Sequence, residues 1–156
     1  MNRSSVQAPA RRLARAGALF FLVLAACDRT GGVDEGPRVL ELTHDTIQLP
    51  DSVRLIDVKV RRDTSGDFEP ASVQVKQNDM VRFTAADRAG HAIAFDGAVL
   101  TADVREYLER TGQLRGPPLI TTDAAWVITL DGAPAGLYPF RCVTHDLGGT
   151  LTVTTR

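Results

Sequence analysis

Apolar and polar residues alternate with a period of two along most of the chain after Arg38. Ile56, Val58 and Val60, for example, alternate with charged residues. Successive side chains of a strand point to opposite faces, so this pattern predicts strands with one buried face. Segments of the same kind follow at 73–75, 81–83, 91–95, 126–130, 137–142 and 151–155, separated by turn residues. About seven short strands joined by turns predict an all-β, antiparallel sandwich.

One segment, residues 102–111, departs from this alternation. Asp103 could cap a helix together with Glu106, and Val104, Leu108 and Thr111 would share one face of that helix. Gly112 follows as a stop signal. We therefore expect a single helix of about ten residues inserted between strands.

The N-terminal segment has the pattern of an export signal. Residues 1–15 hold four arginines and no acidic residue, and residues 16–26 form an uncharged apolar run. At about 1.5 Å per residue this run is too short to cross a hydrocarbon core of about 30 Å. Its end, Leu24-Ala25-Ala26-Cys27, resembles the bacterial lipoprotein box, in which the cysteine is lipidated through its sulfur. The alternative is a plain signal peptide, with Cys27 as an ordinary thiol or disulfide partner.

These observations divide the chain into three parts. Residues 1–26 are the predicted signal peptide, residues 27–37 a tether rich in glycine and charge, and residues 38–156 the folded domain. Without the first 26 residues the chain has 14 basic and 19 acidic residues, a net charge of −5. This charge gives no reason to expect a nucleic-acid partner. We expect an exported monomer, held to a membrane by its lipid anchor and facing the periplasm or the cell exterior.

The residues with metal-binding chemistry lie at strand ends. By the period of two, Cys142 shares an inward face with Tyr138 and Phe140, and His91 also points inward. His145 follows Cys142 by three residues, so a short loop could bring both side chains to one ion. One thiolate and two imidazoles suit copper in both oxidation states, because neither Cu(I) nor Cu(II) is then held in its own preferred geometry.

Other interpretations of these residues remain open at this point. Zinc can also be bound by one cysteine and two histidines, with a water completing the tetrahedron. A lone buried cysteine usually behaves as a small hydrophobic residue, and a lone histidine is often only hydrogen-bonded. His44, beside Asp45 and outside the strand ends, is expected to be a solvated surface residue.

Two stretches of the chain resemble the cupredoxins, the family of plastocyanin and azurin. The first is ASVQVKQNDMVRFTAADRAGHAIAF at 71–95, and the second is AGLYPFRCVTHDLGGTLTV at 135–153, which matches the family pattern Gly-x-Tyr-x-Phe-x-Cys-x-x-His. The resemblance implies a Greek-key β-sandwich. It also implies that His91, Cys142 and His145 bind one copper ion, which alternates between Cu(I) and Cu(II) as it transfers single electrons.

Two departures from the family pattern bear on the metal site. The family usually has an axial methionine after the second histidine, whereas Leu147 occupies that loop here. A leucine has no lone pair, so a raised reduction potential is expected, because the axial ligand tunes it. Met80 is the alternative axial candidate. Ala92 stands where plastocyanin-like members often have a bracing asparagine, so a brace for the ligand loop must come from elsewhere, or the loop is looser.

The leading functional hypothesis is a type 1, or blue, copper protein that carries electrons between redox proteins of the cell envelope. The alternatives are a copper carrier or buffer without redox cycling, and a domain that keeps the scaffold for interaction alone. We do not expect an enzyme. Three histidines are too few for a multicopper oxidase, and a binuclear copper centre needs two cysteines on one loop.

Overall fold

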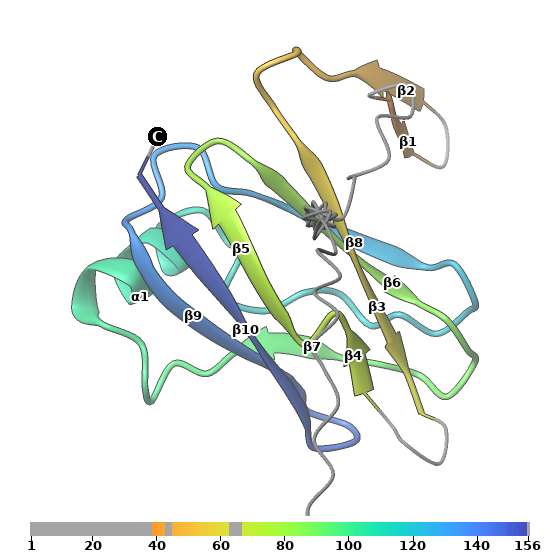
Figure 1. Cartoon of the computed structure of the whole chain (residues 1–156). Helices are drawn as coiled ribbons and strands as arrows, with labels where there is room; N and C mark the ends of the chain where they lie inside the picture. Colours follow the sequence, from red (N-terminus) through yellow and green to blue (C-terminus); the bar gives the residue numbers. More distant parts are fainter. Residues whose placement is uncertain (1–38, 43–44, 63–66, 156) are drawn as a thin grey trace, which may run out of the picture. The chain divides into compact units, whose positions relative to one another are not determined.

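The computed structural model describes residues 39–42, 45–62 and 67–155 of the chain. Within these ranges the chain forms a β-sandwich of two four-stranded sheets, a separate two-stranded pair and one helix (Figure 1). The first sheet holds, in spatial order, β5 (Ser72–Lys76), β10 (Leu147–Thr154), β9 (Gly136–Cys142) and β7 (Ile93–Phe95). The second sheet holds β4 (Asp67–Glu69), β3 (Leu55–Arg61), β6 (Met80–Ala85) and β8 (Ala125–Thr129). The separate pair is β1 (Val39–Leu42) with β2 (Asp45–Gln48).

The sandwich prediction is confirmed, but the prediction that all its strands are antiparallel is wrong. β10 pairs with β5 in parallel, and β3 pairs with β6 in parallel. The chain passes from β3 and β4 in the second sheet to β5 in the first, and returns to the second sheet at β6. This crossover brings β3 and β6 side by side in the same direction, which a hairpin cannot do.

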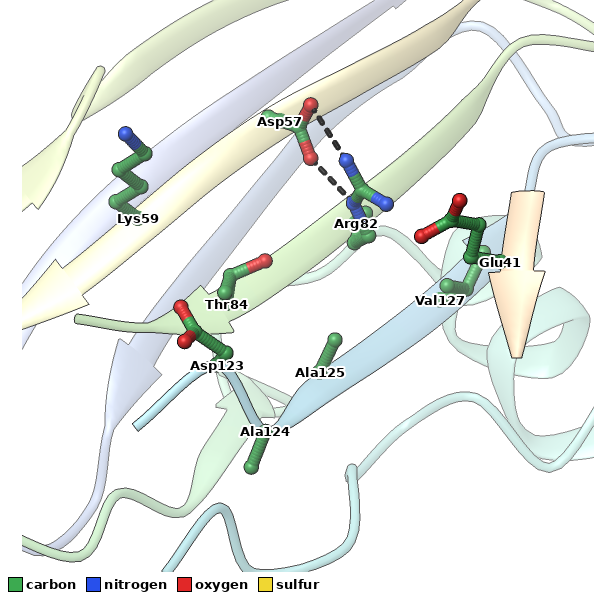
Figure 2. Close-up of a pocket in the computed structure, with 9 residues that line it drawn as sticks. All are labelled: Glu41, Asp57, Lys59, Arg82, Thr84, Asp123, Ala124, Ala125 and Val127. Carbon is green, nitrogen blue, oxygen red and sulfur yellow. Dashed lines mark hydrogen bonds and ion pairs between the residues drawn. The ribbon is translucent and has the colours of Figure 1, made fainter. Parts of the chain in front are cut away.

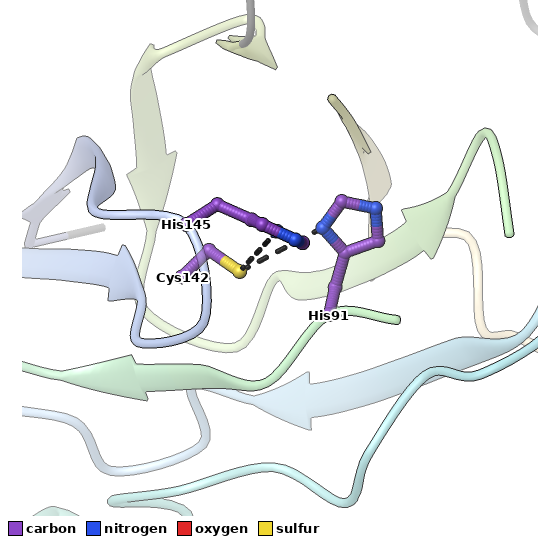
Figure 3. Close-up of side chains that lie close together, drawn as sticks. All are labelled: His91, Cys142 and His145. Atoms are coloured by element: carbon purple, nitrogen blue, oxygen red, sulfur yellow. Dashed lines mark hydrogen bonds between the residues drawn. The ribbon is translucent and has the colours of Figure 1, made fainter. Parts of the chain in front are cut away.

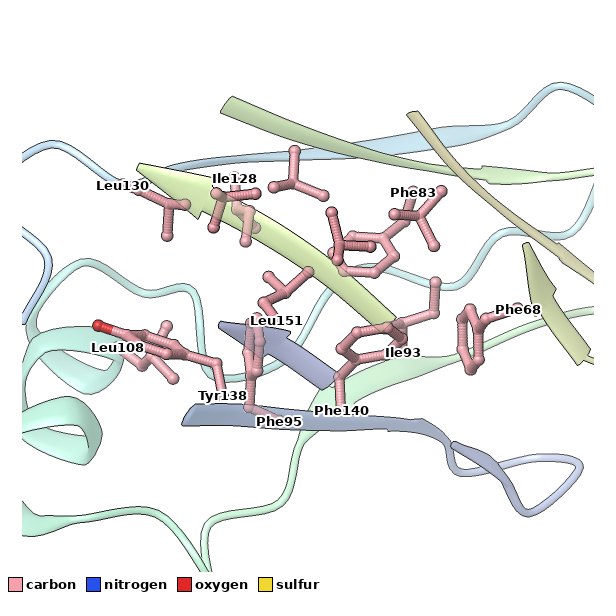
Figure 4. Packing of buried hydrophobic residues seen from close by; sticks show 14 of the residues in the cluster. Phe68, Phe83, Ile93, Phe95, Leu108, Ile128, Leu130, Tyr138, Phe140 and Leu151 are labelled. Carbon is pink, nitrogen blue, oxygen red and sulfur yellow. The ribbon is translucent and has the colours of Figure 1, made fainter. Parts of the chain in front are cut away.

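The core lies between the two sheets and contains side chains from both of them (Figure 4). The predicted alternation is confirmed on β9, where Tyr138, Phe140 and Cys142 are buried while Leu137 and Arg141 are exposed. The result is a closely packed cluster from which the end of β9 emerges with its thiol directed inward. The same close packing accounts for the glycine at position 149 of β10.

Gly149 of β10 lies against this cluster. A Cβ atom at this position would collide with the ring of Phe140 and would lie 2.6 Å from the backbone oxygen of Ala71. Glycine therefore allows β10 to pass close to β5 and to the core at this point.

The inserted helix, α1 (Ala102–Arg110), is confirmed, with two corrections. The N-cap is Thr101 rather than Asp103, which lies in the first turn. Thr111 ends the helix and is exposed, and Tyr107 joins Val104 and Leu108 on the buried face instead. The Tyr107 hydroxyl donates to the backbone oxygen of Thr129 at 2.9 Å, which satisfies its polar group inside the protein. A tyrosine has an apolar ring and a polar hydroxyl, so the sequence alone does not show whether it is buried.

The ends of several strands meet at one end of the sandwich. Cys142, the last residue of β9, lies opposite Ile93, the first residue of β7, and opposite Leu147, the first residue of β10. The helix belongs to the other end, because Val104 lies beside Gly136, the first residue of β9: a Cβ atom added to this glycine would be 3.7 Å from Cγ2 of Val104. The loops that carry His91 and His145 therefore emerge at the Cys142 end.

Candidate metal centre

The thiol of Cys142 lies in a fully buried position at the end of β9. The backbone around it is held on two sides. The strand pairs with β7 and β10 at this residue, and the next N–H, that of Val143, donates to the backbone oxygen of Ala92 at 2.8 Å. The sulfur is therefore placed by paired strands and not by a loose loop.

His145 is brought back over Cys142 by a tight turn. The backbone oxygen of Cys142 accepts hydrogen bonds from the N–H groups of His145, at 3.3 Å, and of Asp146, at 3.0 Å. Asp146 has a φ of 55°, a left-handed conformation that aspartate tolerates better than most residues. The turn leads directly into β10, so the His145 ring is partly exposed while its backbone is fixed.

His91 comes from a distant part of the chain, 51 residues before Cys142. Its backbone exchanges two hydrogen bonds with Leu119, at 2.9 and 2.8 Å, which form an isolated bridge just before β7. The residue is 1% exposed. The second ligand-type imidazole is thus buried as well as anchored.

The three side chains converge on one point (Figure 3). The sulfur of Cys142 lies 3.6 Å from Nδ1 of His91 and 3.5 Å from Nδ1 of His145, and the three ligand-type atoms all lie within 4.8 Å of one another. For comparison, sulfur and nitrogen ligands about 2.3 and 2.0 Å from one zinc ion, at angles of about 110–120°, are about 3.5–3.7 Å apart. The spacing therefore fits a single ion of this size. The sequence prediction that these residues meet is confirmed by their distances.

The donor set favours copper over zinc. Two imidazole nitrogens and one thiolate, with a weak or missing axial ligand, form the trigonal arrangement typical of a blue-copper site. A closed structural zinc site would have a fourth strong protein ligand, so among zinc sites only the open type, with a water in the fourth position, shares this set of three. In the part of the chain that the structure describes, no further histidine, cysteine, aspartate or glutamate joins this group.

Electrostatics favour the metal-binding form of His145. Burial lowers the pKa of this imidazole below its usual 6.5, and coulombic interactions with His91 and Arg62 lower it further, whereas the nearby Asp87 carboxylate acts in the opposite direction. A lower pKa keeps the ring neutral at neutral pH. A neutral imidazole offers a nitrogen lone pair to a metal.

Asp87 is a site residue that the sequence analysis missed. Its Oδ1 atom lies 2.8 Å from Nε2 of His91. The same carboxylate accepts hydrogen bonds from the backbone N–H groups of Arg62, at 2.6 Å, and Ala89, at 2.9 Å. These bonds, that of Arg62 first, lower its pKa to about 2, so the group is a carboxylate at neutral pH. The available signal was an aspartate four residues before His91, within a loop that the strand pattern does not cover.

The two axial candidates are placed differently. Leu147 is partly buried, packs against the core and lies opposite Cys142 in the β9–β10 register. This register places Leu147 next to the sulfur ligand but does not test its axial role, which stays a prediction. Met80 is the first residue of β6, whereas the chain leaves for His91 only after Ala85 at the other end of that strand. Six residues of strand span about 17 Å. Met80 therefore lies at the far end of β6 from the loop that carries His91, which argues against an axial role for it.

Some sequence predictions lie outside the described residues. These are the signal peptide at 1–26, the tether at 27–37, the lipidation of Cys27 and the surface position of His44. Among the residues that are described, no helix combines the length and the apolar character needed to span a bilayer.

A pocket lies elsewhere, on the second sheet (Figure 2). Its lining includes Arg82 of β6, which forms an ion pair with Asp57 of β3, together with Lys59, Glu41 and Asp123. The lining carries charges of both signs, three carboxylates and two cationic side chains. The metal-ligand candidates take no part in this pocket.

The β-sandwich and the His-Cys-His cluster together define a candidate mononuclear metal protein. No protein-family model matches the chain, and no curated protein matches it. Among solved structures, the chain is similar to a purple cupredoxin from Nitrosopumilus maritimus, at 18% identity over 64% of this chain and 99% of that one, with a TM-score of 0.46.

Two further cupredoxins of solved structure show a similar level of likeness. One is an amicyanin variant in its Cu(I) form, at 22% identity over 64% of this chain and 82% of that chain, with a TM-score of 0.48. The other is a pseudoazurin from Sinorhizobium meliloti, at 18% identity over 65% of this chain and 74% of that chain, with a TM-score of 0.43. With TM-scores below 0.5, these likenesses carry no argument about function. The function is therefore inferred from the geometry of the His-Cys-His cluster.

Proposed function

We propose that the protein is a type 1 copper protein that transfers single electrons between redox proteins of the cell envelope. The observation that carries this proposal is the buried Cys142 sulfur with the Nδ1 atoms of His91 and His145 at 3.6 and 3.5 Å. These residues would bind one copper ion, which takes up an electron as Cu(II) and releases it as Cu(I).

The anchoring of the ligands supports electron transfer over copper delivery. The backbone of each ligand residue is fixed by hydrogen bonds. Cys142 is held within β9, His145 by the turn that follows this strand, and His91 by its bridge to Leu119. A rigid donor set changes little between the two oxidation states, which favours fast electron transfer. A carrier must instead release its ion, which a site opened by loop motion would do more readily.

The two histidines differ in exposure, and this difference indicates where electrons would enter and leave the proposed site. His91 is buried, whereas His145 is partly exposed at the end of the sandwich. We assign His145 as the port through which electrons pass to and from partner proteins. In the proposal the domain is exported and monomeric, and lipidated Cys27 holds it at a membrane close to these partners.

The test is the visible absorption spectrum of the full chain loaded with Cu(II). We expect an intense thiolate-to-Cu(II) band that disappears on reduction and returns on reoxidation, at one copper per chain. A colourless protein that binds only Cu(I) would overturn electron transfer and would favour the copper carrier or buffer.

The axial position can be tested by Leu147→Met. If Leu147 lies over the ion, the added thioether stabilises Cu(II) and lowers the reduction potential. A tenfold stabilisation of Cu(II) corresponds to about 59 mV for a one-electron couple, so we expect a decrease of about 60 mV or more by voltammetry. Leu151→Met, a similar change in the buried interior of the same strand, is the matched control and should leave the potential unchanged. Equal potentials for Leu147→Met and the unmodified protein would show that Leu147 is not axial.

A further inference from the structure

The carboxylate of Asp87 connects the backbone of the second sheet to the ring of His91. Arg62, directly after β3, donates its backbone N–H to Oδ2, and Ala89 donates to Oδ1. The loop is fixed to the same strand by a further bond, from the N–H of Ala86 to the backbone oxygen of Val60 at 2.8 Å. The carboxylate is therefore held before it meets the imidazole.

The two nitrogens of the His91 ring face different partners. Figure 3 shows one ring nitrogen directed at Cys142 and His145 and the other directed away from them. The second one, Nε2, lies 2.8 Å from Oδ1 of Asp87, and the His91 side chain is 0% exposed. No water is needed to satisfy either nitrogen, because each has a protein partner.

We propose that Asp87 is the positioning residue for His91, which it holds in the Nε2–H tautomer with the Nδ1 lone pair directed at the metal site. The inference deepens the proposed function and rests on it for the identity of the metal. Both oxygens of Asp87 already accept hydrogen bonds from backbone N–H groups, so the carboxylate meets the ring as an acceptor. An imidazole that offers a lone pair on one nitrogen carries its single N–H on the other. Nε2 must therefore donate to Asp87, which leaves Nδ1 as the lone-pair nitrogen toward Cys142.

This arrangement supplies the brace that Ala92 cannot provide. Ala92 has no side-chain hydrogen-bonding group, whereas Asp87 fixes the ring from the opposite side of the ligand nitrogen. A carboxylate partner also raises the electron density on the imidazole and strengthens it as a ligand. Asp87 therefore orients the ring, selects its tautomer and increases its affinity for the metal.

The first test uses the metal-free full chain and needs no substitution. Long-range proton–nitrogen NMR correlations of the histidine rings, recorded near pH 8, distinguish the two neutral tautomers. We expect His91 to be in the Nε2–H form. Detection of the Nδ1–H form would overturn the inference. Because no copper is present, this result does not depend on the outcome of the spectroscopic test of the proposed function.

The second test compares variants for Cu(I) affinity in competition with a chromogenic chelator. Asp87→Ala removes the acceptor, and we expect affinity to fall by about 10–100-fold, the usual effect of losing an outer partner of a ligand. Asp87→Asn keeps the shape but turns one oxygen into an NH2 group, which must face either Arg62 N–H or His91 Nε2–H, so a loss is expected here too.

Asp103→Asn is the matched control, with the same change of charge in the first turn of α1. It should bind Cu(I) as the unmodified protein does. Amide spectra of each metal-free variant report whether the sandwich is retained. Unchanged Cu(I) affinity and an unchanged His91 tautomer in folded Asp87→Ala would reject the positioning role. Failure of the unmodified protein to bind Cu(I) would reject the proposed function instead.

Discussion

Replacing Cys142 by serine is expected to abolish the visible thiolate-to-Cu(II) band and to weaken Cu(I) binding by at least about 100-fold. The band requires a sulfur ligand, and the oxygen of serine is a harder donor that suits Cu(I) poorly. Loss of a direct ligand should cost at least as much as loss of an outer partner, for which 10–100-fold is usual. Absorption spectra and competition with a Cu(I) chelator measure the two effects.

The chain provides a matched control in its other cysteine, since its sequence has two. Cys27→Ser should leave the band and the Cu(I) affinity unchanged. The hydroxyl of serine at position 142 can donate a hydrogen bond to one of the two Nδ1 atoms that now face the sulfur, so the fold should survive, which thermal unfolding can verify. A visible band that persists in Cys142→Ser, or disappears in Cys27→Ser, contradicts the assignment of the thiolate.

The site could be predicted from the sequence because its three ligands follow simple rules of strand geometry. Alternation placed Cys142 on the apolar face of β9, and the short spacing to His145 required a tight turn after that strand. His91 was reached by the same parity rule, and the resemblance to cupredoxins joined it to the other two. Each of these inferences uses local sequence or a recognised motif.

Asp87 could not be predicted in the same way. Its role depends on where the loop 86–90 lies against the end of β3, and on which nitrogen of His91 faces outward. Both depend on long-range packing, which the period of a strand does not encode. The family pattern also directed attention to position 92, where a brace was expected and alanine stands.

The parallel pairing of β3 with β6 and of β5 with β10 was missed for a related reason. Alternation identifies a strand and its buried face, but it does not show which neighbour the strand pairs with or in which direction. The three residues of β4 were too few to show a periodic pattern. The parallel direction of β3 and β6 follows from the crossover of the chain between the two sheets, which the residue pattern does not show.

The largest effect on stability is expected from Phe140→Ala. Phe140 is 2% exposed and lies at the centre of an aromatic cluster, with ring centroids 4.8 Å from Phe68, 5.1 Å from Phe83 and 6.4 Å from Phe95. Removing such a ring costs about 3–5 kcal/mol, through lost burial and the cavity that remains. Since whole domains are stable by only about 5–15 kcal/mol, chemical denaturation of the metal-free protein should show a large loss.

Leu137→Ala, on the same strand, separates this effect from a general sensitivity of β9. Leu137 is 59% exposed, so its replacement should change the free energy of unfolding by no more than about 0.5 kcal/mol. Equal destabilisation by the two variants would contradict the role of Phe140 as the centre of the core.

Phe140 also shares the buried face of β9 with Cys142, two residues further along, so the cavity lies beneath the metal ligand. The folded Phe140→Ala protein should consequently bind Cu(I) more weakly than Leu137→Ala, because packing in the core fixes the position of the sulfur.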